Sequence, residues 1–338
     1  MKYMTYYSNF SISKRGKFCL SILFFLFSIS LCSEFIANHR PLVVYYQHAY
    51  YFPVVRYYPS TVFAGKYYTE TDYTSTTFLS QMAQHGWAIW APIRFSYDTI
   101  DSTHALTFLS PPSGTHILGT DDLGRDVFAR LLYGMRTSLI FSFLLTSLSL
   151  TLGLIIGSYC GYYGGYVDIF FQKLLEIWSA FPRLYIVLMF SSFYHVTFFT
   201  LLVFMLALSW TRFVRLIRAE YMRARNLSYV QSAKSLGQKN NIIMYGHILP
   251  NILPSLLSLI PWHILSHLFT LAFLDFLGIG FNTHYASFGE LLSQAKMNLH
   301  APWLAMSICS TLFFLLYLLV AVAESIRSPL LIDHHTYD

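Results

Sequence analysis

The stretch SLIFSFLLTSLSLTLGLIIGSYC, residues 138–160, is predominantly apolar and contains no Asp, Glu, Lys or Arg. It is longer than the ~20 residues that a helix needs to cross the hydrocarbon core of a membrane. The rest of the chain has a similar character: of its 338 residues 55% are hydrophobic and only 11% are charged, and its mean hydropathy is +0.48. This composition excludes an ordinary soluble globular domain.

Five further apolar runs have a length close to that of a membrane span. They cover residues 18–37, 169–192, 195–215, 253–278 and 303–324. Together with residues 138–160 they predict an all-α polytopic membrane protein with about six transmembrane helices. An even number of crossings places both ends of the chain on the same side.

The basic residues indicate how the predicted spans are oriented. Lys14, Arg15 and Lys17 precede the first run, and seven further Lys and Arg residues lie between residues 211 and 252. Loops rich in Lys and Arg stay in the cytoplasm, so both groups are predicted there. The net charge of +6 and the sequence pI of about 9.0 therefore reflect topology, and no nucleic-acid partner is predicted.

Spans and charges together predict five regions. They are a cytoplasmic N-terminus (1–17), a transmembrane anchor (18–37), a periplasmic segment ending in an amphipathic helix (38–137), a five-helix core with a cytoplasmic coupling loop at 216–250 (138–328), and a cytoplasmic tail (329–338). The first apolar run also resembles the core of a signal peptide. No small-x-small cleavage site follows it, so we predict an uncleaved anchor.

The exported segment is rich in tyrosine. Tyrosine suits binding surfaces and membrane boundaries because one edge of its ring is apolar and the other polar. Two interpretations stay open, a small domain packed at the membrane surface and a contact surface for a partner. The tyrosines concerned include Tyr45, Tyr46, Tyr50, Tyr51, Tyr57, Tyr58, Tyr67 and Tyr68.

The sequence LGTDDLGRDV at residues 118–127 has the pattern of a helix start. Thr120 is placed to cap a helix whose first turn carries two carboxylates, and Asp126 and Arg130 have the spacing of an i,i+4 pair. The pattern predicts an amphipathic helix on the outer membrane face, either a passive surface helix or a gating element. The candidate gate residues are Asp121, Asp122, Arg125, Asp126 and Arg130.

A second motif, SYVQSAKSLG at residues 228–237, lies in the longest predicted cytoplasmic loop. Ser228 and Gln231 have the spacing of a capping box, and Gly237 is placed to end the helix in a left-handed conformation. A helix of this length cannot fold alone, but its face of Tyr229, Ala233 and Leu236 suits a groove on another protein. The pattern favours a docking helix over an ordinary loop helix.

These motifs, in this order and spacing, resemble the permease subunits of ABC-type dipeptide and oligopeptide importers, and most closely the second permease of the microcin C and oligopeptide importer. The resemblance runs from about residue 87 to residue 328. Gln231 and Ser232 depart from the family, which usually has an acid and an alanine there. Besides residues 118–127, the matching stretches are 90–100 (WAPIRFSYDTI), 162–168 (YYGGYVD), 274–280 (LDFLGIG), 288–292 (FGELL) and 298–304 (NLHAPWL).

The resemblance implies a permease that forms half of the pathway for oligopeptides or peptide-like compounds across the bacterial inner membrane. The implied partners are a second homologous permease, two cytoplasmic ATPase domains and a periplasmic peptide-binding protein. The chain lacks a G-x-x-x-x-G-K-[ST] loop, so we expect it to bind no cofactor, with ATP and Mg²⁺ handled by the partner subunits. The implied ATPase-docking residues are Ser228, Tyr229, Val230, Gln231, Ser232, Ala233, Leu236, Gly237, Leu249 and Pro250.

Titratable residues in the spans suggest competing interpretations. His263 and His267 are one helical turn apart, but no nearby pair of Cys, Asp or Glu completes a metal site, so no metal is predicted. A secondary transporter or channel using Asp275, His263 and His267 is the alternative function. A membrane enzyme ranks below it, because no nucleophile, base and orienting acid are grouped. We expect these three residues to line the pathway, where Asp275 would favour basic peptides.

Overall fold

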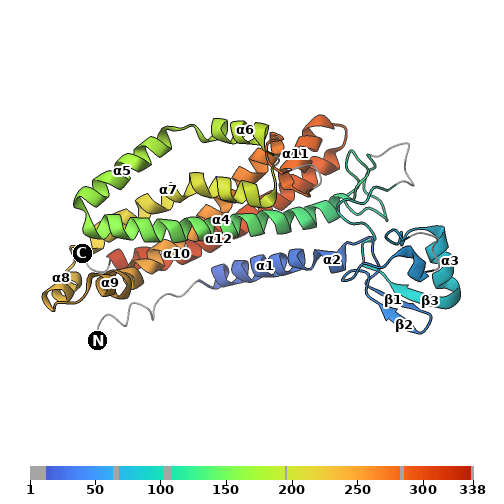
Figure 1. Cartoon of the computed structure of the whole chain (residues 1–338), viewed down its shortest axis with the longest axis horizontal. Coiled ribbons are helices and arrows are strands. Elements are labelled where there is room, and N and C mark those ends of the chain that lie inside the picture. The colour runs from blue at the N-terminus through green and yellow to red at the C-terminus, as the bar shows by residue number, and fades with distance from the viewer. Residues whose placement is uncertain (1–12, 64–67, 102–108, 195, 282–284, 336–338) are drawn as a thin grey trace. The chain divides into compact units, whose positions relative to one another are not determined.

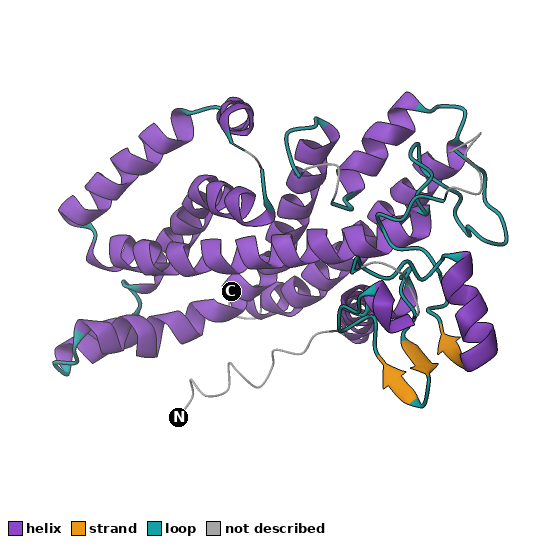
Figure 2. Cartoon of the chain, turned by 45° about the vertical axis from the view of Figure 1, so that its right-hand side comes forward, coloured by secondary structure: helices purple, strands orange, loops and turns teal. Residues whose placement is uncertain are grey.

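The computed structural model describes residues 13–63, 68–101, 109–194, 196–281 and 285–335, and these are mainly helical, as predicted (Figures 1 and 2). Four helical segments in the described part are long and apolar enough to cross a membrane. They are α4 (Val127–Tyr163), α7 (Phe198–Ala224), the segment Asn240–Phe276 that ends in α10 (Leu249–Phe276), and α12 (Pro302–His335) up to residue 326.

A fifth candidate span is broken in two. Helices α5 (Gly165–Ala180) and α6 (Arg183–Phe193) meet at an angle of 68°. The break lies at Phe181 and Pro182, because a residue that precedes proline is pushed out of the helical conformation. Phe181 accordingly has an extended backbone, with ψ of 128°.

The N-terminal span stays a prediction. Helix α1 (Lys14–Leu31) has 18 residues, but three of the first four are basic, and the short α2 (Ser33–Ile36) follows it. It is therefore long enough for a span, but it carries three charged residues, whereas each of the other candidate spans has an 18-residue stretch with at most two. The described helices thus account for four or five crossings, and the sixth crossing awaits a direct test.

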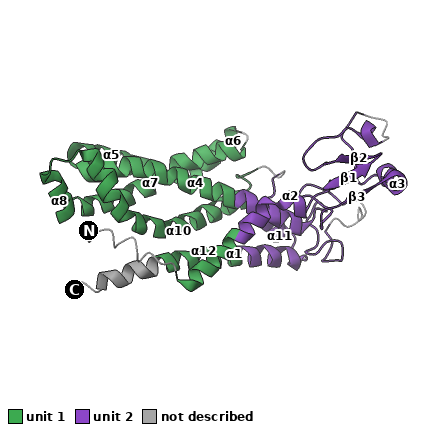
Figure 3. Ribbon diagram, turned by 90° about the horizontal axis from the view of Figure 1, so that it is seen from below, with its two compact units in different colours: residues 1–24, 139–282, 313–338 green, residues 25–138, 283–312 purple. Residues whose placement is uncertain are grey.

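The chain divides into two compact units (Figure 3). Unit 1 comprises residues 1–24, 139–282 and 313–338, and unit 2 comprises residues 25–138 and 283–312. Unit 1 holds most of α4, together with α5, α6, α7 and α10. It also holds the predicted cytoplasmic loop, which contains α8 (Ser228–Ser235), α9 (Asn240–Ile242) and a π-helical segment, Ile243–Ile248.

Within unit 1, α4 packs closely against α7 through three glycines spaced four residues apart, Gly153, Gly157 and Gly161. A Cβ added to Gly157 would lie 2.9 Å from the carbonyl oxygen of Val214, and one added to Gly161 would lie 2.6 Å from that of Arg218. Only glycine allows two helix backbones to approach this closely. The sequence analysis did not anticipate this row.

Unit 2 contains a small sheet built from the tyrosine-rich segment (Figure 2). Strands β1 (Val43–Tyr46), β2 (Ala49–Tyr51) and β3 (Gly86–Ile89) are antiparallel in the order β2-β1-β3, and α3 (Thr76–His85) contacts β3. One face packs on an aromatic cluster. Its buried members are Val44, Tyr46, Phe63, Tyr73, Phe78 and Met82.

The other face of the sheet carries an aromatic row. Tyr45 pairs with Tyr50 across one strand boundary and with Trp87 across the other, with ring centroids 5.0 Å and 5.8 Å apart. Alternating side chains of a strand point to opposite faces, which separates this row from the buried cluster. The segment therefore folds as a small domain with its own core, and both interpretations of its role stay open.

Candidate functional site

Residues 118–126 form a tight loop around the carboxylate of Asp121. Its Oδ1 accepts hydrogen bonds from the backbone N–H groups of Leu123 at 3.0 Å and Arg125 at 2.8 Å. Gly124 has φ of +76°, a conformation that glycine adopts readily. The helix predicted to start after Thr120 is therefore wrong, because this motif folds as a loop and regular helix begins at Val127.

Thr120 does not have the capping role that was predicted for it. The hydroxyl of Thr120 accepts a hydrogen bond from the backbone N–H of Ser110 at 2.7 Å and so closes the loop. Asp126 caps α4 instead, because its Oδ1 accepts from the backbone N–H of Ala129 at 2.8 Å. The acid at the start of α4 also suits the positive end of the helix dipole.

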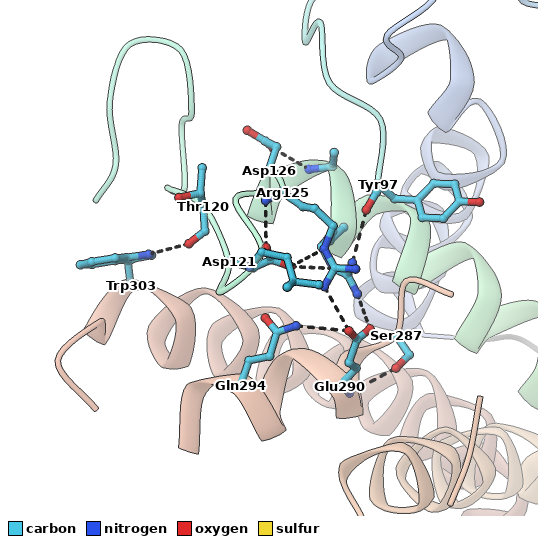
Figure 4. A network of polar contacts seen from close by, with 12 residues as sticks. Tyr97, Thr120, Asp121, Arg125, Asp126, Ser287, Glu290, Gln294 and Trp303 are labelled. Atoms are coloured by element: carbon cyan, nitrogen blue, oxygen red, sulfur yellow. Dashed lines mark hydrogen bonds and ion pairs between the residues drawn. The ribbon is translucent and has the colours of Figure 1, made fainter. Parts of the chain in front are cut away.

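Arg125 meets Glu290 of α11 (Phe288–Met297), as Figure 4 shows, and Arg130 contacts the same carboxylate. Nη2 of Arg125 donates to Oε1 of Glu290 at 3.2 Å, and Nη2 of Arg130 donates to Oε2. Arg125 also donates from Nε to Oδ2 of Asp121 at 2.8 Å. Arg130 donates from Nη1 to the carbonyl oxygen of Tyr97 at 3.3 Å. We call Asp121, Arg125, Arg130 and Glu290 the outer ion cluster.

Helix α11 fixes the position of Glu290. The Ser287 hydroxyl accepts from the backbone N–H of Glu290 at 3.2 Å and so caps the helix. One turn further on, Nε2 of Gln294 donates to Oε1 of Glu290 at 3.2 Å. Both contacts orient the carboxylate toward the two arginines.

The outer ion cluster is buried and balanced in charge. The side chains of Asp121 and Arg130 are fully buried, and that of Glu290 is 14% exposed. Two guanidinium groups face two carboxylates, so no net charge is left in the interior. The predicted i,i+4 pair between Asp126 and Arg130 is wrong, because each finds partners elsewhere.

Burial raises the pKa of two carboxyl groups in or beside the outer ion cluster, those of Glu290 and Asp122. Burial raises the pKa of Glu290, while the guanidinium groups of Arg130 and Arg125 lower it. Burial and the neighbouring Asp121 raise the pKa of Asp122, whose side chain is outside the ion cluster. Of the predicted gate residues, Asp121, Arg125 and Arg130 therefore act together, and Asp122 does not.

Asp126 belongs to a second buried group centred on His116. The Nδ1 atom of His116 lies 2.8 Å from Oδ2 of Asp126, and Nε2 lies 3.1 Å from Oδ2 of Asp101. The ring of His116 therefore lies between two carboxyl groups, with one ring nitrogen within hydrogen-bonding distance of each. His116 thus ties the segment around Asp101 to the first turn of α4.

The inner motif forms the predicted short helix but starts differently. The N-cap of α8 is Leu227, with no side-chain cap, so Ser228 is the first helical residue. The predicted capping box is therefore wrong, and Nε2 of Gln231 donates to the carbonyl oxygen of Asn226 at 3.2 Å instead.

The predicted end of α8 is confirmed. Gly237 has φ of +74°, and its N–H donates to the carbonyl oxygen of Lys234 at 2.9 Å. The N–H of Gln238 donates to the carbonyl oxygen of Ala233 at 3.2 Å. These two bonds form a Schellman motif, in which a left-handed residue satisfies the last carbonyls of a helix.

Helix α8 has one buried face and one exposed face. Val230 and Ala233 are buried against Tyr221, Ile243 and Met244 of the same unit. The exposed residues include Ser228, Gln231, Ser232 and Ser235, and Leu236 beyond the last turn is 80% exposed. The face available to a partner is therefore polar, whereas the predicted contact through Ala233 is directed inward.

Several contacts hold this loop to the turn between α4 and α5. Arg218 of α7 forms a two-bond ion pair with Asp168, of which the Nη2–Oδ2 distance is 2.6 Å. The hydroxyl of Tyr162 donates to Oδ1 of Asn240 at 2.9 Å, and Lys234 lies 5.0 Å from the Tyr162 ring centroid. The loop then continues through the π-helical segment into Leu249 and Pro250, which open α10.

Of the three predicted pathway residues, His263 and His267 lie together, with ring centroids 6.3 Å apart, while Asp275 has separate contacts. His263 packs on the Phe213 ring with centroids 4.1 Å apart, and Nδ1 of His267 lies 3.0 Å from the hydroxyl of Thr146. Asp275 accepts from the backbone N–H of Phe281 at 2.7 Å and so holds the turn after α10. A pathway role for these residues stays a prediction.

The main residues that the sequence analysis missed are Glu290, His116, Asp168 and the α4 glycines. Glu290 and Asp168 lie within stretches that show the family resemblance, yet nothing in their local pattern names a partner far away in sequence. Isolated charges in a chain with only 11% charged residues are the signal that identifies such pairs. Three glycines spaced four residues apart in an apolar run are the corresponding signal for close helix packing.

Known proteins place these features in a family. The family described as "Binding-protein-dependent transport system inner membrane component" matches residues 153–323. The chain belongs to this family. The matched range contains α8 and α11, and it excludes the small sheet domain.

Three relatives of this permease differ in how much of it they cover. It is 39% identical to the inner membrane ABC transporter permease protein YejE of Escherichia coli over 95% of this chain and 94% of the relative. It is 37% identical to the peptidoglycan transport system permease protein YejE of Agrobacterium fabrum over 95% of this chain and 90% of the relative. It is 34% identical to the oligopeptide transport system permease protein OppC of Bacillus subtilis over 67% of this chain and 75% of the relative. The permease is thus an inner-membrane transport subunit.

Proposed function

We propose that this permease forms half of the translocation pathway of an ATP-driven importer for oligopeptides or peptide-like compounds. The observation that carries the proposal is its likeness, over 95% of its length, to two transport permeases, one of them named for peptidoglycan transport. The likeness to an oligopeptide permease supports the same substrate class. The complete importer would add a second homologous permease, two ATPase domains and a periplasmic binding protein.

The permease itself is proposed to be non-catalytic and to bind no cofactor. Its sequence lacks the glycine-rich loop that cradles nucleotide phosphates. ATP and Mg²⁺ would bind the partner ATPases, and the exposed face of α8 would transmit their closure. The geometry supports this role, because one face of α8 is anchored in unit 1 while the other is exposed.

The outer ion cluster is proposed to act as a latch on the outer side. Arg125 and Arg130 hold the loop at residues 118–126 and the start of α4 to Glu290 of α11. A buried and balanced cluster of this kind has a well-defined closed state, since separating its partners exposes charges that must be hydrated again. Opening of the outer gate would separate these groups or move them as one body.

Purification of the tagged permease from native membranes tests this function. We expect an ATPase and a second permease to accompany it. With the native cysteines replaced, Gln231→Cys should cross-link to the ATPase, whereas Ser80→Cys on the exported α3 should not. Recovery of the permease alone, with no ATPase cross-link from α8, would contradict the proposal.

A further inference from the structure

Three arginines of unit 1 gather where the fifth candidate span is broken. Arg183 opens α6, four residues after Ser179 of α5, and Arg212 and Arg215 lie on α7, where Arg215 contacts the Ser179 hydroxyl. In the described ranges, none of the eleven ion pairs includes any of these three residues.

Among the described residues, Arg212 and Arg215 make polar contacts with neutral groups only. Nη1 of Arg212 donates to the Ser266 hydroxyl at 3.3 Å. Nη2 of Arg215 donates to the Ser179 hydroxyl and to the carbonyl oxygen of Leu175 at 3.4 Å. Hydroxyls and carbonyls hold a guanidinium group in place but leave its charge uncompensated. The α6 dipole adds positive potential at the same point, because Arg183 stands at the N-terminus of this helix.

Counting along the helices places these groups deep in the membrane. In the predicted topology Phe193, Phe198 and Phe276 mark the outer ends of α6, α7 and α10. At the helical rise of ~1.5 Å per residue, Arg183 lies about 15 Å and Arg212 about 21 Å below those ends. The hydrocarbon core is ~30 Å thick, so Arg183 lies near its middle and Arg212 in its inner half, on the membrane side of the predicted cytoplasmic loop at 216–250.

All three arginine side chains are exposed on the surface of this chain. An arginine that faces lipid near the middle of a bilayer is costly, so such residues face protein or a water-filled pathway. A guanidinium group presents paired N–H donors that match a carboxylate in two-bond geometry. The local chemistry therefore suits a negatively charged oxygen group that passes through the pathway.

We infer that Arg183, Arg212 and Arg215 form a binding site for the carboxylate groups of the transported peptide. The inference rests on the proposed function and names the charge of its preferred substrates. This preference is the reverse of the one for basic peptides that was expected from Asp275. The Oδ1 atom of Asp275 already accepts from the backbone N–H of Phe281. It also packs against Gly280 so closely that a Cβ added there would lie 1.8 Å away.

Uptake of a matched peptide pair tests the inference. The complete importer, in proteoliposomes with its binding protein, is given a tripeptide with a free C-terminal carboxylate and the same tripeptide as its amide. Both peptides meet the same binding protein in every assay, so a change in their uptake ratio reports on the permease. We expect Arg212→Gln and Arg183→Gln each to lower the ratio about tenfold, the effect of one lost charge-assisted hydrogen bond.

Control variants separate this effect from misfolding. Arg212→Lys should keep most of the preference, and Arg223→Gln should leave it unchanged, because Arg223 pairs with Glu220 on the exposed surface. Each variant must purify with its ATPase at the wild-type ratio. An unchanged uptake ratio in both glutamine variants would overturn the inference but would leave the proposed function intact. Absence of ATP-driven uptake of either peptide by the wild type would overturn the proposed function as well.

Lipid phosphate offers the same oxygen chemistry, and a second arm of the experiment distinguishes it. The assays are repeated in vesicles of phosphatidylcholine alone and in vesicles that also contain phosphatidylglycerol. We expect the glutamine variants to lose carboxylate preference equally in both. An effect that occurs only with phosphatidylglycerol would assign the arginines to lipid binding and overturn the inference.

Discussion

At the scale of single residues, Glu290 holds the outer side of the permease together. Its two oxygens each accept from a different arginine, one from the loop at residues 118–126 and one from α4. A buried ion pair adds little net stability over an apolar contact, but removal of one partner leaves the other charge buried and uncompensated. Substitution of Glu290 alone, with both arginines kept, should therefore destabilise the fold.

The Glu290→Gln variant should lose about 3 kcal/mol of folding free energy, the usual effect of breaking a buried ion pair. The loss can be measured as a lower melting temperature of the detergent-solubilised complex. Glu176→Gln is the matched control, because its pair with Lys173 is exposed on both sides and contributes little. Equal melting temperatures for the two variants would contradict the buried cluster.

At the scale of elements, the α4 glycines and Gly237 have different functions. The α4 glycines allow close contact with α7, whereas Gly237 allows a left-handed turn after α8. The end of α8 was predictable because a Schellman motif depends on local sequence. Its start was predicted wrongly, since Leu227 and not Ser228 is the N-cap. At residues 118–126 a loop replaces the expected helix, because Asp121 binds the backbone of the loop itself and Arg130 pairs with Glu290, 160 residues away in sequence.

The Gly157→Ala variant should destabilise the complex by about 1–3 kcal/mol, as overpacking of a core does. The new Cβ would lie 2.9 Å from the carbonyl oxygen of Val214 and 3.0 Å from Cβ of Ile217. Gly246→Ala serves as control, since its Cβ would meet only a side-chain atom of Ile242 at 3.6 Å. Thermal unfolding of both variants in the same detergent compares them directly, and an equal effect would argue against close α4–α7 packing.

The Gly237→Val variant should insert and pair with its partner permease but lose coupled transport. A β-branched residue in the left-handed region costs ~1–2 kcal/mol, which distorts the end of α8. A Cβ at this position meets no atom of this chain within 4 Å, so loss of function would reflect the turn or the docked partner. ATP hydrolysis stimulated by the loaded binding protein is measured beside Gly246→Val. Full uptake with normal hydrolysis in Gly237→Val would count against α8 as the docking element.

At the scale of the whole molecule, the apolar runs were sufficient to predict a mainly helical membrane protein. Apolar runs report burial in lipid, so the spans around α4, α7, α10 and α12 follow from composition alone. The break at Pro182 and the three-stranded sheet were not predicted. The break follows from the local effect of Pro182 on Phe181 and lay within an unbroken apolar run, whereas the sheet depends on neighbours distant in sequence, as in the pairing of Tyr45 with Trp87.

Topology is the part of the whole-molecule account that labelling tests. Single cysteines at Ser80 and Ser235, in a background without the native cysteines, should react with a membrane-impermeant reagent from opposite sides. Both positions are exposed on helices of the described chain. Reaction from the same side would contradict the six-span arrangement.

The most direct test of the central claim is uptake by the reconstituted importer under two energy sources. Proteoliposomes that contain this permease, its partner permease and the ATPases receive a loaded peptide-binding protein outside, and peptide entry is measured. We predict uptake when ATP is inside, with hydrolysis that rises when the loaded binding protein is added, and no uptake from an ion gradient alone. Uptake that follows a proton or sodium gradient and is indifferent to ATP would contradict the account.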